Sequence, residues 1–114
     1  MKKLILLLTA VLILLSIHSF AKEKEAPTKA SFKVSGNCDQ CKKRIEKAAK
    51  TEGVKSAVWN VDTHVMTVSF LPSKISLDKI QQNIAKAGHD TEKFKAEDTD
   101  YKKLPQCCQY DRKN

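Results

Sequence analysis

The feature that most constrains the fold is the order in which two kinds of apolar pattern follow one another between residues 30 and 95. Some segments alternate apolar and polar side chains, as half-buried strands do, and others repeat apolar side chains at helical spacing. In order, the segments are a strand at 32–34, a helix at 39–50, strands at 54–61 and 66–70, a helix at 77–87 and a strand at 91–94. This order predicts an α+β, ferredoxin-like βαββαβ fold, with a four-stranded antiparallel sheet and two helices on one face.

The first 21 residues have the layout of a secretory signal peptide. Lys2 and Lys3 supply the positive start, residues 4–17 supply the apolar run, and Ser19 and Ala21 are small residues at the two cleavage positions. An uncleaved anchor is the alternative, but the run is shorter than the roughly 18 to 20 apolar residues of a membrane-spanning helix. We therefore expect cleavage near Ala21 and a periplasmic or secreted protein that is not held in a membrane.

The rest of the chain divides into three parts. Residues 22–29 are rich in Lys and Glu and form a short solvated lead-in, residues 30–95 form the folded domain, and residues 96–114 form a C-terminal tail that contains cysteines. The formal net charge of the chain is +8. Because the basic residues are mixed with acidic ones and form no block, the sequence does not favour a nucleic-acid partner.

Two cysteines at the start of the first helix are the candidate metal ligands. Cys38-Asp39-Gln40-Cys41 lies where the first strand gives way to the helix, so the two thiols can converge on one point. The free N–H groups and the positive end of the helix dipole favour the thiolate form that metals bind. Two thiolates with few other donors suit Cu(I) better than tetrahedral Zn(II). The sequence therefore predicts a Cu(I) site at Cys38 and Cys41, with Hg(II), Ag(I), Cd(II) and Zn(II) as the other candidate ions.

With this motif in this order of elements, residues 31–94 resemble the heavy-metal-associated domain family. That family includes copper chaperones, metal-binding modules of copper-transporting ATPases, and the periplasmic mercury-scavenging protein. The matching residues are Phe32-x-Val34, Cys38-x-x-Cys41, Ile45-Glu46, Gly53-Val54, Asn60-Val61, Val68 and Ala87-Gly88. The resemblance implies that the two motif cysteines bind the ion. One departure is Asn37-Cys38, where the family usually has Met-Thr-Cys.

Three further residues are candidates for the site. The resemblance places His89 near the metal loop, where it either ligates the ion or lies at the surface or behind the ligands and tunes the charge of the site. Cys107 and Cys108 either fold back to add thiolates, bridge two chains through a shared metal, or form a disulfide after export. Apolar and aromatic residues around them, such as Tyr101 and Tyr110, indicate that the tail docks somewhere.

His64 lies in the turn between the second and third strands. We expect this turn at the end of the domain opposite to the metal loop, with the histidine exposed to solvent.

These observations favour a non-enzymatic protein that captures Cu(I) in the cell envelope and carries, scavenges or transfers it. Its partner would be a metal transporter or efflux protein, and it would be a monomer or a metal-bridged dimer. The main alternative is a thiol-disulfide oxidoreductase, because CxxC at a helix start is also a redox arrangement. A third interpretation is a metal-sensing interaction module for a transporter. The sequence contains no hydrolytic triad, phosphate-binding glycine loop or paired carboxylates.

Overall fold

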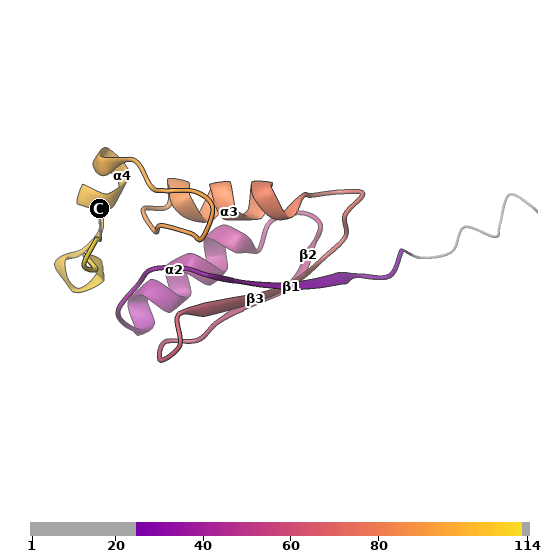
Figure 1. Ribbon diagram of the computed structural model, residues 1–114, viewed down its shortest axis with the longest axis horizontal. Coiled ribbons are helices and arrows are strands. Elements are labelled where there is room, and N and C mark those ends of the chain that lie inside the picture. The colour runs from indigo at the N-terminus through magenta and orange to yellow at the C-terminus, as the bar shows by residue number, and fades with distance from the viewer. Residues whose placement is uncertain (1–24, 113–114) are drawn as a thin grey trace, which may run out of the picture.

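Residues 25–112 are described by the computed structural model, so the predicted signal peptide at residues 1–21 lies outside the described residues. The chain runs from a first strand to a helix, through a hairpin to a second helix, and ends in two short helical turns (Figure 1). The elements are β1 (Thr28–Lys33), α2 (Asp39–Ala49), β2 (Val54–Trp59), β3 (Val65–Phe70), α3 (Leu77–Lys86), α4 (Asp98–Lys102) and the 3-10 helix η1 (Gln106–Cys108).

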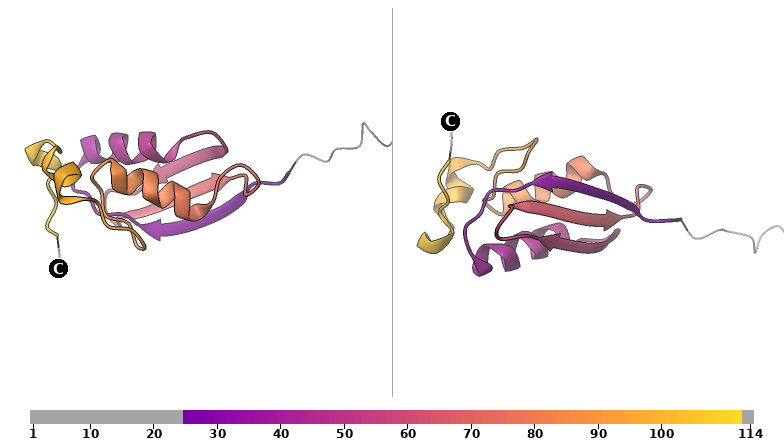
Figure 2. Two further views of the ribbon diagram at one scale, coloured as in Figure 1. Left: turned by 90° about the horizontal axis from the view of Figure 1, so that it is seen from above. Right: turned by 60° about the horizontal axis from the view of Figure 1, so that its bottom comes forward.

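The sheet is antiparallel, and its strand order is β1-β3-β2. β3 lies in the middle, with Phe70 opposite Thr28 of β1 and Met66 opposite Trp59 of β2. Helices α2 and α3 cover the same face of this sheet, as Figures 1 and 2 show. The predicted sandwich of a sheet with two helices on one face is therefore present.

The core forms where the alternating face of the sheet meets the apolar sides of the helices. Met66 and Val68 of β3 are fully buried, as are Ile45 of α2 and Ile84 of α3. Burying a side chain of this size stabilises the fold by about 1.5 to 3 kcal/mol. Trp59 at the end of β2 is also fully buried, and it packs beneath the loop that follows β1. The core thus supports this loop directly.

The predicted fourth strand at residues 91–94 is absent from the part of the chain that the structure describes. Thr91 forms a single isolated bridge with Val34, and the segment then turns back on itself. The amide of Thr91 donates to the carbonyl of Phe94 (2.7 Å), and the amide of Lys93 donates to Gln81 Oε1 of α3 (3.1 Å). The amide of Glu92 does donate to the carbonyl of Lys33 (2.9 Å), but the next amide on that side, that of Phe94, donates to Thr91 Oγ1 (2.9 Å). The pairing with β1 therefore stops at this bridge, and the sheet has three strands rather than four.

The described part of the C-terminal tail folds back onto the domain. Figures 1 and 2 show α4 and the last turns at the end of the sandwich where α2 begins. Leu104 and Tyr110 belong to the buried core, and Tyr101 packs against it. Among residues 25–112, no helix combines the length and the apolar character needed to cross a membrane.

Candidate metal centre

The loop between β1 and α2 brings the two motif cysteines together. Cys38 is the N-cap residue of α2 and has extended backbone angles, while Cys41 lies in the first turn of that helix. Their Sγ atoms are 3.5 Å apart. Cys41 is fully buried and accepts a hydrogen bond from the amide of Asn37 (3.4 Å), whereas Cys38 is half-buried. The motif therefore presents one accessible sulfur and one enclosed sulfur side by side.

A third thiol reaches this site from the tail. Cys108 of η1 is fully buried, and its Sγ atom lies 3.8 Å from that of Cys38. The Sγ atoms of Cys38, Cys41 and Cys108 all lie within 4.8 Å of one another. These separations are well above the roughly 2.05 Å of a disulfide bond, and all three residues are free cysteines. Three sulfurs at this spacing can close on one soft ion.

Cys107 lies beside this cluster without belonging to it. Its side chain is exposed and donates a hydrogen bond to Gln40 Oε1 (3.2 Å). Its Sγ atom is 3.9 Å from that of Cys108, and its carbonyl accepts a hydrogen bond from the thiol of Cys38 (3.6 Å). Of the two tail cysteines, Cys108 faces the motif and Cys107 faces outward.

The surroundings of the three thiols give them different pKa values. The backbone amide of Cys41 donates to Cys38 and is the largest cause that lowers the pKa of Cys38 from 9.0 to about 7. Burial raises the pKa of Cys41 to about 11, and burial also raises the pKa of Cys108. In the metal-free protein at neutral pH, Cys38 is therefore partly ionised and the other two thiols hold their protons. A metal ion must displace those protons when it binds.

Arg44, a basic residue of α2, lies near the thiols. The pKa of Cys108 is raised by its burial, and the nearby Arg44 guanidinium acts in the opposite direction. Within the described chain, the Nη1 atom of Arg44 is buried and has no hydrogen-bond partner. A positive charge here offsets part of the negative charge that thiolates bring into a buried site.

His89 is fully buried but does not join the thiol cluster. Its Nδ1 atom lies 2.8 Å from the carbonyl oxygen of Ser35. A carbonyl only accepts hydrogen bonds, so Nδ1 carries the proton. Burial lowers the pKa of His89 and favours its neutral form. Its ring stacks on Tyr110 at 5.6 Å. The structure thus places His89 behind the loop and under the tail, and the alternative of a surface histidine is wrong.

The expectation for His64 is also wrong. Both β1 and β2 run antiparallel to β3, so they run parallel to each other. Their C-terminal ends therefore lie at the same end of the sheet. The turn after β2 therefore lies at the end of the domain that carries the cysteine loop. The carbonyl of His64 accepts a hydrogen bond from the amide of Val34 (2.9 Å), and its half-buried ring stacks on Trp59 at 5.5 Å. The predicted order of strands already implied this position of the turn.

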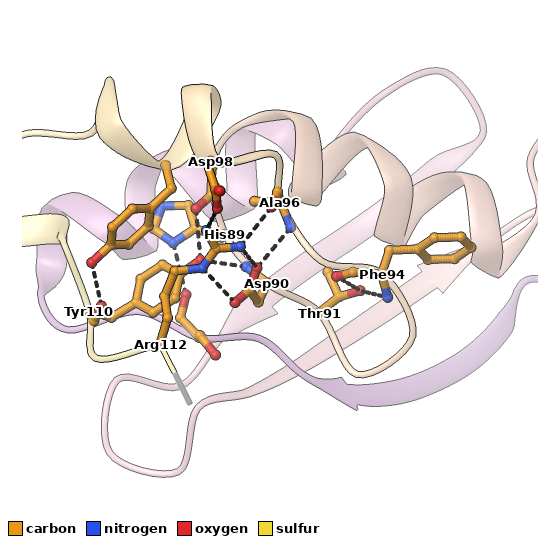
Figure 3. Close-up of polar contacts among 11 residues, drawn as sticks. His89, Asp90, Thr91, Phe94, Ala96, Asp98, Tyr110 and Arg112 are labelled. Atoms are coloured by element: carbon orange, nitrogen blue, oxygen red, sulfur yellow. Dashed lines mark hydrogen bonds and ion pairs between the residues drawn. The ribbon is translucent and has the colours of Figure 1, made fainter. Parts of the chain in front are cut away.

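Polar contacts that were not predicted fasten the tail to the domain (Figure 3). The Arg112 guanidinium donates to both carboxylate oxygens of Asp90, at 2.9 and 3.2 Å. The hydroxyl of Tyr110 donates to the carbonyl of Gly88 (2.8 Å) and accepts from the amide of Asp90 (2.8 Å). The hydroxyl of Tyr101 donates to the carbonyl of Tyr110 (2.6 Å). Only the aromatic character of the tail hinted at this docking.

Comparison with known proteins gives consistent matches for the domain. A family profile described as the heavy-metal-associated domain matches residues 31–90. A copper chaperone, CopZ of Staphylococcus epidermidis, is 34% identical over 65 residues, which are 55% of this chain and 96% of the chaperone. A copper-exporting P-type ATPase of Staphylococcus saprophyticus is 39% identical over 70 residues, 59% of this chain but only 9% of the ATPase.

A solved structure shares the fold. It is the N-terminal domain of a potential copper-translocating P-type ATPase from Bacillus subtilis in the Cu(I)-loaded state. It is 33% identical to this chain, with a TM-score of 0.54, and the alignment covers 57% of this chain and 84% of that domain. Cys38 and Cys41 lie inside the range matched by the family profile, whereas Cys107 and Cys108 lie outside it.

Proposed function

Because the chain belongs to the heavy-metal-associated domain family, we propose that it binds Cu(I) through Cys38 and Cys41 and passes the ion on by thiolate exchange. Domains of this family in copper chaperones are metal-binding modules and not enzymes. The observation that carries the proposal is the pair of sulfurs, 3.5 Å apart, at the N-terminus of α2. A helix N-terminus and a low pKa at Cys38 both favour the thiolate form that a soft ion needs.

Cu(I) is the ion that the relatives and the donor set favour together. The two sequence relatives are named for copper, and the structural relative is described as loaded with Cu(I). Thiolate sulfur selects soft ions over Mg(II) and Ca(II). Hg(II) and Ag(I) share this softness, whereas structural Zn(II) sites almost always have four ligands. The titration described below therefore includes Ag(I) and Zn(II) beside Cu(I).

Transfer by thiolate exchange needs no change of oxidation state. A thiolate of the receiving protein forms a bond to Cu(I), a bond from the ion to a sulfur of this chain breaks, and the released thiolate takes up a proton. Cys38 is the half-buried member of the pair, while Cys41 is enclosed. Exchange would therefore begin at Cys38.

A copper transporter is the receiving partner that the relatives favour. On the outer side of α2, Lys43 and Lys47 are exposed close to the loop. Lys42 is less available, because its ammonium group donates to Glu46 (2.9 Å) and to the carbonyl of Trp59 (2.8 Å). Exposed positive charge beside the site would favour an acidic docking surface and raise the rate of association.

Export to the cell envelope is also part of the proposal. It is supported by the layout of residues 1–21, which has a basic start, an apolar run and a small residue at position 21. N-terminal sequencing of the protein recovered from the producing cells would test this part. A start near Lys22 supports export with cleavage, and an intact Met1 start contradicts cleavage.

The binding proposal can be tested by anaerobic titration. The reduced protein is titrated with Cu(I) against a competing chelator, beside a Cys38→Ser/Cys41→Ser variant and a Cys107→Ser control, with Ag(I) and Zn(II) in parallel. We expect tight binding of one Cu(I) per chain that disappears only in the double variant. Tight binding that survives in the double variant, or none in the unaltered protein, would rule the proposal out.

A further inference from the structure

We propose that Cys108 is a third ligand to the ion, so that the chain holds it in a three-thiolate site made of Cys38, Cys41 and Cys108. This inference rests on the proposed function, because it assumes that the CxxC loop binds a soft ion. It also goes beyond the family match, which ends at residue 90 and does not include the tail.

The three sulfur atoms lie close enough together to share one ion. The Cys108 Sγ atom lies 3.8 Å from the Cys38 Sγ atom, almost the same separation as the 3.5 Å between the two motif sulfurs. All three atoms lie within 4.8 Å of one another. A soft ion at their centre can therefore reach each sulfur after small side-chain movements. Cu(I) accepts low coordination numbers, so three sulfurs can complete its shell.

Contacts outside the thiol cluster hold the tail in place. Tyr110, two residues after Cys108, is 3% exposed, and its hydroxyl bonds to Gly88 and Asp90. Leu104, four residues before it, is buried next to Gly88. Cys108 is thus anchored on both sides. An anchored ligand has already lost its conformational freedom, so metal binding need not order the tail.

A positive charge lies where a three-thiolate site would need one. One Cu(I) ion with two thiolates carries one net negative charge, and a third thiolate adds another. Such a charge inside a protein needs a partner. The Arg44 guanidinium lies beside Cys108, and its buried Nη1 atom has no hydrogen-bond partner within residues 25–112. A deprotonated thiolate cluster would give this nitrogen an acceptor. The positive charge of Arg44 would also offset part of the negative charge of a site with three thiolates.

The arrangement gives Cys107 and Cys108 different roles. Cys108 faces the motif and is fully buried, whereas Cys107 is exposed and bonds to Gln40. A receiving protein that takes the ion must break the bond to Cys108 as well as those to the motif. The tail would therefore make this chain hold Cu(I) more firmly than the two motif cysteines could alone.

X-ray absorption at the copper edge, which counts the sulfur atoms bound to the metal, tests this proposal on the full chain loaded with one Cu(I). We compare the unaltered protein with Cys108→Ser and with Cys107→Ser as the matched control. We expect three sulfurs in the unaltered protein and the control, and two in Cys108→Ser. Competition with a chelator should show an affinity for Cu(I) at least about ten- to a hundredfold lower in Cys108→Ser, because even the loss of a residue that only supports a metal ligand costs this much.

The outcomes separate this proposal from the one on which it rests. Two sulfurs in the unaltered protein, with binding that needs Cys38 and Cys41, would overturn the role of Cys108 and keep the carrier. No tight Cu(I) binding would overturn both. Should Cys108→Ser fail to fold, three sulfurs in a monomeric Cys107→Ser protein still identify Cys108, because it is then the only tail cysteine. Three sulfurs found only in a metal-bridged dimer would contradict the proposal.

Discussion

Two nitrogen atoms of Arg112 donate hydrogen bonds to the Asp90 carboxylate: Nη2 lies 2.9 Å from Oδ1 and Nε lies 3.2 Å from Oδ2 (Figure 3). Both side chains are more than four-fifths buried. Asp90 directly follows His89 at the end of the domain, and Arg112 lies four residues beyond Cys108. The pair therefore fastens the tail to the domain on the far side of the third thiol.

Replacing Arg112 should weaken both the fold and the site. Hydrogen bonds to charged groups contribute about 1.5 to 3 kcal/mol, so we expect Arg112→Ala to lower the free energy of unfolding by about 2 kcal/mol. Cys108 should also become accessible to a thiol reagent. Urea unfolding and thiol labelling of the reduced, metal-free protein measure the two effects.

Lys103→Ala provides the control for that experiment. The ammonium group of Lys103 lies 3.9 Å from the Asp100 carboxylate, and its side chain is 79% exposed. Exposed pairs of this kind contribute about 1 kcal/mol or less, so this variant should match the unaltered protein. Equal effects of the two substitutions would contradict the account of the tail.

The Asp90–Arg112 pair should also make stability depend on pH in the acid range. Burial alone raises the pKa of Asp90, but hydrogen bonds from Arg112 and from the amide of Ala96 outweigh it and bring the pKa below its ordinary 3.8. A carboxylate with a lowered pKa in the folded state stabilises the fold above its unfolded pKa, and this contribution is lost as pH falls through the folded value.

The stability difference between the unaltered protein and Asp90→Asn should therefore be present near neutral pH and shrink below about pH 3.8. Urea midpoints at several pH values measure it. A difference that stays constant across this range would show that the charge of Asp90 is not the cause.

Cys38 should react with alkylating reagents at lower pH than an ordinary thiol. Because the pKa of Cys38 is about 7, its alkylation rate in the metal-free protein should rise with a midpoint near pH 7. Cys41 has a pKa of about 11 and is fully buried, so it should stay unreactive. Mass spectrometry of digested samples identifies the labelled residue.

The same chain unfolded in urea is the reference, in which the midpoint for Cys38 should return toward 9.0. A midpoint near 9 in the folded protein would mean that the start of α2 does not activate this thiol.

Gly88 and Gly53 offer a matched pair of substitutions. Both have left-handed backbone angles, with φ of 105° and 94°. A Cβ atom at Gly88 would lie 2.9 Å from the carbonyl oxygen of Asp100 and from Leu104, whereas one at Gly53 would meet Lys74 and Ile75. We expect each Gly→Ala change to destabilise the fold by about 1 kcal/mol or more, since alanine disfavours this conformation. Only Gly88→Ala should also expose Cys108 to labelling.

Exposure of Cys108 by Gly53→Ala to the same degree would count against this distinction. Gly53 adjoins β2 at the end of the sheet away from the cysteine loop, so its substitution tests whether general loss of stability is enough to release the tail.

The parts of the fold that could be predicted from sequence are those encoded by neighbouring residues. The alternation of Met66, Val68 and Phe70 marks a strand, and Ser76 caps α3 by accepting a hydrogen bond from the amide of Lys79. The CxxC spacing likewise fixes the two motif sulfurs on one helix start. These signals need no knowledge of the rest of the chain.

The predictions that were wrong or left open concern contacts between residues that are distant in the sequence. The strand predicted at 91–94 does not form because Thr91 and Phe94 bond to each other in a turn, which no periodicity reveals. Cys38 and Cys108 are separated by 70 positions, and sequence alone left the role of the tail cysteine open. The error on His64 was different, because tracing the strand directions of the predicted fold would have placed its turn beside the cysteine loop.

The most direct test of the account is the kinetics of copper release. The Cu(I)-loaded protein is mixed with increasing concentrations of a dithiol chelator under nitrogen, and the rate of transfer is followed. If the ion moves by thiolate exchange at Cys38, the rate should rise with chelator concentration, and should rise more steeply in Cys108→Ser. A rate that does not depend on chelator concentration would mean that copper must first dissociate, and would contradict the role of this chain as a carrier that hands its ion on.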